Sequence, residues 1–360
     1  MRQTIYVQRC ERNEVLYFAV ILKEKCMTKH VLARIMTAAV VVVFLFALFT
    51  PCQAAPKEYK LKAVSAWPKT IFEVQNFMKF LDIVKEKVAK ECPGELAIDY
   101  VGGPEVMPNR EQVEALRNGL VDMVFTTVGY YVSIIPEADG LNLTALRPWE
   151  ERAKGVNDFL NKIHQEKANA FYLGRLGSGN PFALYLIKPI TKLSDLKGMK
   201  IRGSPTHIPF IKALGAQPVV IPPPDVYTAL ERGLVDGYMW PVGLIRDWGW
   251  NEVTKYIVEP FFYEAVNIVL INIEAWKKLP KNLQDLLIAA EEQAEHYAVD
   301  RAHSYVQTEL TKLQKEGIKI IKLPPDQAKE FKKLAYDSMW DVVIKKAPEN
   351  GPKLKEMISK

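Results

Sequence analysis

Two octapeptides in this chain are nearly the same: ALRNGLVD at 115–122 and ALERGLVD, 114 residues later, at 229–236. Six of the eight letters match. In each copy, apolar residues recur at the spacing of the buried face of a short helix, and a glycine stands where a helix end requires a left-handed residue. The apolar sets are Val113, Leu116 and Leu120 in the first copy and Val226, Leu230 and Leu234 in the second.

The residues around the two copies match as well. Apolar stretches that suit strands lie before them at 96–100 and 218–221, and after them at 123–125 and 237–240. Strand, helix, glycine and strand in this order form a βαβ crossover. A motif that merely ends a helix well would not bring matching strands with it, so the repeat predicts two α/β lobes of related design.

The rest of the chain fits this arrangement. We expect further strands at 59–66, 170–173, 182–187, 200–202 and 266–273, and helices at 71–90, 209–214 and 326–344. Residues 282–316 contain neither proline nor glycine. This stretch predicts a helix of about 35 residues, roughly 50 Å long at 1.5 Å per residue, which matches a two-lobed protein better than a single lobe.

The N-terminal region has the pattern of an export signal. An apolar run, AAVVVVFLFALF at 38–49, follows Lys29 and Arg34 and precedes a segment with small residues at 52–55. This order is typical of a secretory signal peptide, and the run is shorter than the ~20 residues that cross a bilayer, which leaves a membrane anchor as the weaker alternative. We expect cleavage after Ala54 and a periplasmic protein. Translation could begin at Met1, Met27 or Met36.

Charge and cysteine content exclude several functions. The 48 basic and 42 acidic residues give a net charge of +6, but residues 1–54 carry seven basic and three acidic side chains, so only +2 remains for residues 55–360. Such a body does not favour a nucleic-acid partner. Cys92 is the one cysteine after residue 54, which excludes an internal disulfide and a cysteine-based zinc site.

No pattern of a catalytic centre appears in the sequence. The chain has no HExxH, G-x-S-x-G, P-loop or G-x-G-x-x-G pattern. We therefore expect no catalytic residue, no metal and no cofactor, and we favour a binding protein over an exported α/β enzyme.

Arg202 is the leading candidate for ligand binding. It ends the short predicted strand in KGMKIRGSP at 197–205. Side chains at the carboxyl ends of strands project into the crevice where open α/β sheets bind ligands. The planar guanidinium matches a carboxylate with two parallel hydrogen bonds. The alternative is a surface ion pair, worth ~0–1 kcal/mol.

Three segments carry a resemblance to a known family. They are LSDLKGMKIR at 193–202, LGAQPVVIPPPDVYTALERGLVDGYMWP at 214–241, and GGPEVMPNREQVEALRNGLVDMVFT at 102–126. In order and spacing they resemble the solute-binding proteins of TRAP transporters, the DctP family. The similarity extends over residues 58–345, which is nearly the whole chain after the predicted leader.

The resemblance implies an α/β fold with a two-lobed periplasmic-binding-protein architecture, mixed sheets, hinge strands and a long helix that spans both lobes. After the leader at 1–54, lobe I would comprise 56–180 and 268–307, and lobe II 181–267 and 308–360. The implied function is capture of an organic acid, without catalysis, and delivery to TRAP membrane subunits for ion-gradient-driven uptake. We expect a monomer. A binding protein of an ABC importer or of a sensor is the alternative.

The resemblance also assigns site residues. Arg202 takes the place of the arginine that clamps the ligand carboxylate. Trp240 stands where many relatives carry a polar contact, Phe182 where sialic-acid binders carry a second arginine, and Thr127 where some relatives place an acid. Candidate pocket walls are Trp67, Tyr130, Tyr238 and Phe262. These aromatic residues predict a monocarboxylate with an apolar or aromatic body, in preference to sialic acid, uronates or small dicarboxylates.

Overall fold

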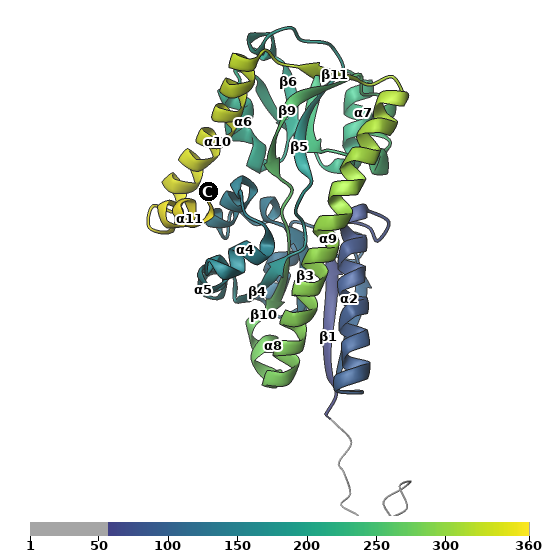
Figure 1. Ribbon diagram of the computed structural model, residues 1–360, viewed down its shortest axis with the longest axis vertical. Helices are drawn as coiled ribbons and strands as arrows, with labels where there is room; N and C mark the ends of the chain where they lie inside the picture. Colours follow the sequence, from purple (N-terminus) through teal and green to yellow (C-terminus); the bar gives the residue numbers. More distant parts are fainter. Residues whose placement is uncertain (1–56, 360) are drawn as a thin grey trace, which may run out of the picture. The chain divides into compact units, whose positions relative to one another are not determined.

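The computed structural model describes residues 57–359, so the predicted leader at 1–54 lies outside the described residues. Two mixed β-sheets form the frame of the fold (Figure 1). The first sheet has the order β2-β1-β3-β10-β4 and the second has the order β11-β9-β5-β8-β6-β7. The strands are β1 (Tyr59–Ser65), β2 (Leu96–Gly102), β3 (Met123–Thr127), β4 (Ala170–Arg175), β5 (Pro181–Leu186), β6 (Lys200–Gly203), β7 (Gln217–Val220), β8 (Gly237–Pro241), β9 (Tyr256–Glu264), β10 (Asn267–Asn272) and β11 (Lys319–Lys322).

Helices connect these strands and cover the sheets. They are α2 (Phe72–Glu91), α3 (Gln112–Arg117), α4 (Pro148–Ala153), α5 (Val156–Ala168), α6 (Ile208–Ala213), α7 (Val226–Glu231), α8 (Ile273–Lys278), α9 (Lys281–Lys315), α10 (Pro325–Lys346) and α11 (Asn350–Ile358). Two 3₁₀ segments matter below: η2 (Pro136–Leu143) and η4 (Pro205–His207). Within residues 57–359, no helix is both long and apolar enough to cross a membrane.

The two sheets share one topology. In the first sheet, β1 is flanked by β2 and β3, both parallel to it, and β10 adds to β3 in the antiparallel direction. In the second sheet, β6 is flanked by the parallel strands β7 and β8, and β5 adds antiparallel to β8. The predicted two α/β lobes with mixed sheets are therefore confirmed, and the repeated octapeptide marks the matching helix and strand of each lobe.

The end of the repeated helix is built in the same way in both lobes. Gly119 and Gly233 have φ of 73° and 66°, the left-handed conformation that the sequence predicts. The backbone N–H of Leu120 donates to the carbonyl of Ala115 at 2.9 Å, and that of Leu234 donates to Ala229 at 2.8 Å. The prediction that these leucines are buried is wrong: Leu120 is 68% exposed and Leu234 is 57% exposed. The glycine turns the chain away before the leucine, which therefore leaves the buried face.

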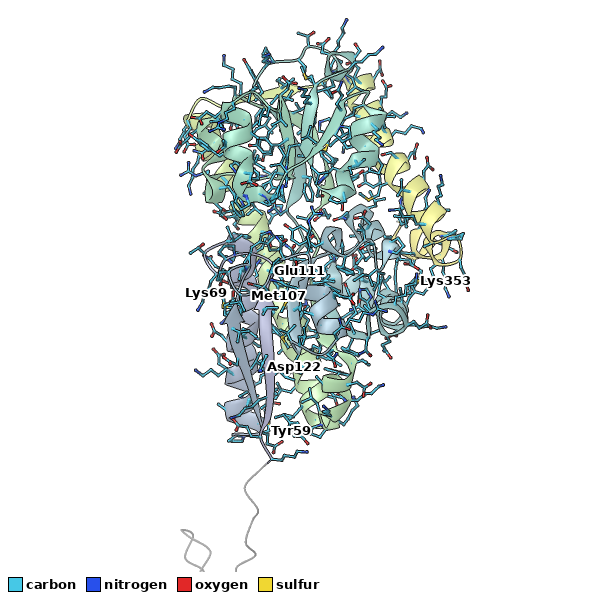
Figure 2. The ribbon with its side chains drawn as sticks, turned by 180° about the vertical axis from the view of Figure 1, so that it is seen from behind. Tyr59, Lys69, Met107, Glu111, Asp122 and Lys353 are labelled. Atoms are coloured by element: carbon cyan, nitrogen blue, oxygen red, sulfur yellow. The ribbon has the colours of Figure 1, made fainter. Side chains whose placement is uncertain are left out.

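The final aspartate of each octapeptide joins the helix end to the central strand. Asp122 accepts a hydrogen bond from the backbone N–H of Lys62 at 2.8 Å (Asp122 is labelled in Figure 2). Asp236 accepts the matching bond from Lys200 at 2.9 Å. Lys62 of β1 and Lys200 of β6 are thus held in the same way in the two lobes.

Two short segments and one long helix connect the lobes. The segment after β4 pairs with the chain at the junction of β9 and β10. Gly177 N–H donates to the Asn267 carbonyl at 2.9 Å, and Ala265 N–H donates to the Asn180 carbonyl at 3.0 Å. The first half of α9 packs in the core of the first sheet through Leu283 and its neighbours, and its second half packs in that of the second sheet through Leu313. Its bounds, Lys281–Lys315, agree with the long helix that the sequence predicts.

The C-terminal segment departs from the predicted division into lobes. Helix α10 lies against α6 and β9 of lobe II but also against η2 of lobe I. Asn350, at the start of α11, donates through Nδ2 to Oε1 of Glu137 in η2 at 3.0 Å, and Ala145 N–H donates to the carbonyl of Ile358 at 3.3 Å. The chain from α11 onward therefore belongs with lobe I. The tail has no counterpart in the repeat, so the repeat could not indicate where it packs.

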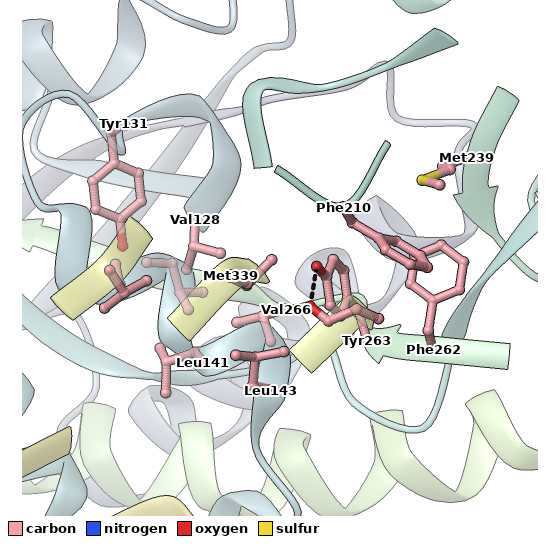
Figure 3. Packing of buried hydrophobic residues seen from close by; sticks show 14 of the residues in the cluster. Val128, Tyr131, Leu141, Leu143, Phe210, Met239, Phe262, Tyr263, Val266 and Met339 are labelled. Atoms are coloured by element: carbon pink, nitrogen blue, oxygen red, sulfur yellow. Dashed lines mark hydrogen bonds between the residues drawn. The ribbon is translucent and has the colours of Figure 1, made fainter. Parts of the chain in front are cut away.

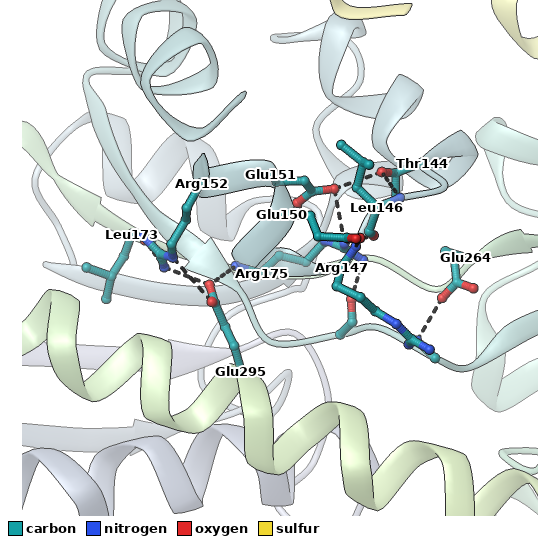
Figure 4. A network of polar contacts seen from close by, with 12 residues as sticks. Thr144, Leu146, Arg147, Glu150, Glu151, Arg152, Leu173, Arg175, Glu264 and Glu295 are labelled. Atoms are coloured by element: carbon teal, nitrogen blue, oxygen red, sulfur yellow. Dashed lines mark hydrogen bonds and ion pairs between the residues drawn. The ribbon is translucent and has the colours of Figure 1, made fainter. Parts of the chain in front are cut away.

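A buried ion pair holds the end of β4, just before the chain leaves lobe I (Figure 4). Arg175 and Glu151 of α4 make two parallel hydrogen bonds of 3.0 Å, and each side chain is 1% exposed. Arg175 also donates to the Leu146 carbonyl at 2.8 Å, and Thr144 donates to Glu151 at 2.9 Å. Arg175, the last residue of β4, is thus held in place where the hinge segment begins.

Candidate functional site

A cavity of about 480 Å³ lies between the two lobes. Strands β3, β6 and β8 end at its wall, with Thr127, Arg202 and Trp240 at or next to their carboxyl ends. This is the edge where α/β sheets bind ligands. Lobe I contributes Trp67, Glu73, Arg110, Thr127, Tyr130 and Asn142, among others, and lobe II contributes Phe182, Arg202, Ser204, His207, Trp240 and Trp248.

Six of the eight predicted site residues line the cavity: Trp67, Thr127, Tyr130, Phe182, Arg202 and Trp240. The other two lie elsewhere. Tyr238 is fully buried two residues before Trp240, about 7 Å back along β8 from the crevice, and its hydroxyl bonds with that of Thr254 at 2.7 Å. Phe262 packs in the core against Phe210 at 4.9 Å between ring centroids (Figure 3).

Arg202 is held by the backbone and keeps part of its guanidinium free. Its side chain is 3% exposed, and its Nε and Nη2 both donate to the Ile221 carbonyl, at 2.9 and 2.8 Å. The prolines at 222–224 stiffen the chain directly after that carbonyl. Nη1 has no hydrogen-bond partner among the described residues. The free edge for a ligand is therefore the one between Nη1 and Nη2.

The charge of Arg202 also lacks a partner among the described residues. Within residues 57–359 no carboxylate forms an ion pair with it, which excludes the alternative of a surface ion pair. Burial, with the charge of Arg110 as a smaller cause, lowers the pKa of Arg202 to about 10. Arg202 thus carries its charge at neutral pH and presents an uncompensated cation to the cavity.

Trp240 lies beside this cation. Its ring centroid is 5.1 Å from the guanidinium carbon of Arg202, which is cation–π distance. Its indole Nε1 is buried and has no partner in the described part of the chain. Trp250 packs against the ring at 4.9 Å between centroids and fixes its orientation.

The lobe I wall is formed by a pair of aromatic side chains. The indole Nε1 of Trp67 donates to the Tyr130 hydroxyl at 3.2 Å, and the ring centroids are 5.7 Å apart. Burial raises the pKa of Tyr130, so the phenol stays neutral. The Thr127 hydroxyl donates to the Val266 carbonyl at 2.9 Å, so it can only accept from a ligand.

Glu73 and His207 are among the cavity residues that sequence reasoning missed. Glu73 lies in the first turn of α2 and is 4% exposed. Asn180 donates to it at 3.3 Å, and burial raises its pKa to about 7. In the sequence Glu73 is only an acidic residue at a helix start, and His207 is a histidine without a neighbouring metal ligand, so neither carried a signal.

The family of this chain follows from its sequence. The model of the bacterial extracellular solute-binding protein family 7, DctP, matches residues 66–346. The chain is a member of the DctP family. A relative from Nostoc sp., a monocarboxylate 2-oxoacid-binding periplasmic protein, is 25% identical over 296 residues, which cover 79% of each chain.

Solved structures of DctP-type proteins have the same fold. A TRAP periplasmic solute-binding protein of Desulfovibrio salexigens with bound orotic acid has a TM-score of 0.73 at 20% identity, and covers 84% of this chain and 97% of its own. A Bordetella pertussis receptor that binds pyroglutamic acid has a TM-score of 0.72 at 21% identity, with 84% and 99% covered.

Membership of the DctP family gives the general function. Proteins of this family bind solutes outside the cytoplasm and work with TRAP membrane subunits, and they are binding proteins rather than enzymes. The prediction of a TRAP solute-binding protein is thereby confirmed, and the alternative of an ABC importer is not supported.

Proposed function

We propose that this protein binds a monocarboxylate with an apolar or aromatic body in the cavity between its lobes and delivers it to TRAP membrane subunits. The observation that carries the proposal is the buried guanidinium of Arg202, which lines the cavity and lacks a carboxylate partner among residues 57–359. A ligand carboxylate would supply the missing charge, because burying an unpaired cation is costly.

The other cavity residues favour this class of acid. Trp67, Phe182 and Trp240 offer aromatic faces, and the prolines at 222–224 add apolar surface without a backbone donor. Burial raises the pKa of the Glu73 carboxyl in this cavity to about 7, which shows that a carboxylate without a cationic partner is costly here and disfavours a diacid. The orotate-binding and pyroglutamate-binding proteins of the same fold also hold compact acids with a ring.

Melting temperatures measured with a set of acids test the ligand class. The set contains phenylpyruvate, 3-phenylpropionate, 2-oxoisovalerate, pyroglutamate and orotate, with glucuronate, sialic acid and succinate as polar counterparts. A bound acid at 100 times its Kd adds ~2.7 kcal/mol to the free energy of unfolding. We expect stabilisation by aromatic or branched monocarboxylates. Stabilisation by glucuronate, sialic acid or succinate alone would contradict the ligand class but not the family.

Export and assembly are part of the proposal. The DctP family is extracytoplasmic, and the signal-peptide pattern at 38–55 supports export of this chain to the periplasm. N-terminal sequencing of the periplasmic protein should give Ala55 as its first residue. Light scattering should give the mass of one chain, since the two lobes form the cavity without a second copy.

A further inference from the structure

Two buried histidines differ in how their ring nitrogens are satisfied. The ring of His164 is fully buried, and both nitrogens have partners: the Leu160 carbonyl at 2.7 Å from Nδ1 and the Tyr131 hydroxyl at 3.0 Å from Nε2. His207 is 2% exposed, yet its Nε2 has no partner in the described residues. His164 does not line the cavity, whereas His207 does.

The partners of Nδ1 fix the tautomer of His207. The backbone N–H of Ser204 points to this nitrogen at 3.1 Å, and a backbone N–H can only donate. Nδ1 therefore accepts and carries no proton. Burial and the charge of Arg202 lower the pKa of His207 to about 3, so the ring is neutral and its proton sits on Nε2. The free nitrogen is a hydrogen-bond donor.

Three hydrogen-bond donors of lobe II thus have no acceptor among the described residues. Nη1 of Arg202, Nε1 of Trp240 and Nε2 of His207 are buried, lack an acceptor in the described part of the chain, and belong to residues that line the same cavity. A buried donor without an acceptor costs about 1–3 kcal/mol. Three such donors at one wall point to an oxygen-rich group that arrives from outside the protein.

We propose that His207 contacts the ligand and donates its Nε2 proton to an oxygen of the bound acid, as a third donor beside Arg202 and Trp240. This inference rests on the proposed function of the cavity. The ring is well placed for such a role: Phe182 packs against it at 4.7 Å between centroids, and Gly203 leaves room for it, since a Cβ there would lie 2.8 Å from the His207 Cβ.

Variants of His207 separate the donor from the ring. His207→Phe keeps a flat ring without a donor, and His207→Gln keeps an N–H near the position of Nε2. Calorimetry with phenylpyruvate and 3-phenylpropionate should show at least about fivefold weaker binding for the Phe variant and near wild-type binding for the Gln variant. Equal losses for both acids place the contact on the carboxylate. A loss for phenylpyruvate alone places it on the 2-oxo oxygen. His164→Phe is the matched control and should leave both affinities unchanged.

A second measurement needs no ligand. Nitrogen-15 NMR of the histidine rings reports which nitrogen carries the proton, and we expect Nε2–H for His207 near neutral pH. A proton on Nδ1, or binding by the Phe variant within twofold of wild type for both acids, would overturn the inference. If the wild-type protein binds neither acid, the acid that raises its melting temperature most replaces the two probes in the same comparison, so the test of His207 does not depend on the ligand class.

Discussion

The guanidinium carbon of Arg202 lies 5.1 Å from the centroid of the Trp240 ring, so a cation and an aromatic face meet at one wall of the cavity. The two residues come from β6 and β8, which are hydrogen-bonded neighbours in the second sheet. Nε and Nη2 donate to the Ile221 carbonyl, which leaves Nη1 without a partner in the described part of the chain.

Replacement of Arg202 should remove most of the affinity. Truncating one partner of a desolvated charge pair costs ~2–5 kcal/mol, so Arg202→Ala should weaken binding about 30-fold or more. Arg202→Lys should also weaken binding, because an ammonium cannot bond the Ile221 carbonyl and present a planar edge to the acid at once. Calorimetry with the acid that stabilises the protein most provides the measurement. Arg232→Ala, an exposed arginine of the same lobe, is the control. Affinities of both Arg202 variants within threefold of wild type would remove Arg202 from the site.

Trp240 should contribute through both its ring and its N–H. Trp240→Phe keeps an aromatic face for Arg202 but loses the unpaired Nε1 donor, and should weaken binding by about 1 kcal/mol. Trp240→Ala loses the face as well and should weaken binding further. Binding constants of the two variants, with Trp149→Ala outside the cavity as control, separate these contributions. Equal affinities of the Phe variant and the wild type would show that the indole N–H does not face the acid.

Much of the fold could be predicted because the sequence repeats it. The octapeptides at 115–122 and 229–236 mark the same helix end in both lobes, and the stretch free of proline and glycine gives α9 almost to the residue. The packing of α11 could not be predicted in this way. It depends on contacts such as that of Asn350 with Glu137, more than 200 positions apart, which leave no local pattern.

The residues of the cavity also differ in whether a local sequence pattern could predict them. Arg202 could be predicted to line the cavity because a strand end and a family motif coincide there. His207 and Glu73 could not, because their importance lies in what surrounds them: one unsatisfied ring nitrogen and one buried carboxyl. Tyr238, in contrast, was predicted to line the cavity and does not. It shares a strand face with Trp240, yet lies two residues too early to reach the cavity.

The titration of Glu73 should make stability depend on pH. Burial raises its pKa in the folded protein to about 7, from 4.5 for an ordinary glutamate. The folded state thus binds the proton more tightly than the unfolded state, so the free energy of unfolding falls as the pH rises from about 4.5 through 7. The loss amounts to roughly 3 kcal/mol.

Urea unfolding at pH 5 and pH 8 should show this loss in the wild type and a smaller one in Glu73→Gln. The buried Asp139 and Glu291 titrate in the same direction, so the difference between the two proteins measures Glu73. Parallel curves for both proteins would contradict the prediction.

The ion pair of Arg175 and Glu151 should be the costliest polar contact to break. Both side chains are 1% exposed, and Glu151→Gln would leave the arginine charge buried without its partner. Losing one member of a buried pair costs ~3–5 kcal/mol.

The matched control is Asp285→Asn, which removes the exposed pair between Lys281 and Asp285 on α9 and should cost less than ~1 kcal/mol. Urea unfolding of the two variants measures both values. Neither Arg175 nor Glu151 lines the cavity, so Glu151→Gln should lower stability with little change in the affinity of the folded protein for its ligand. Similar small losses for both variants would show that the buried pair is no stronger than a surface one.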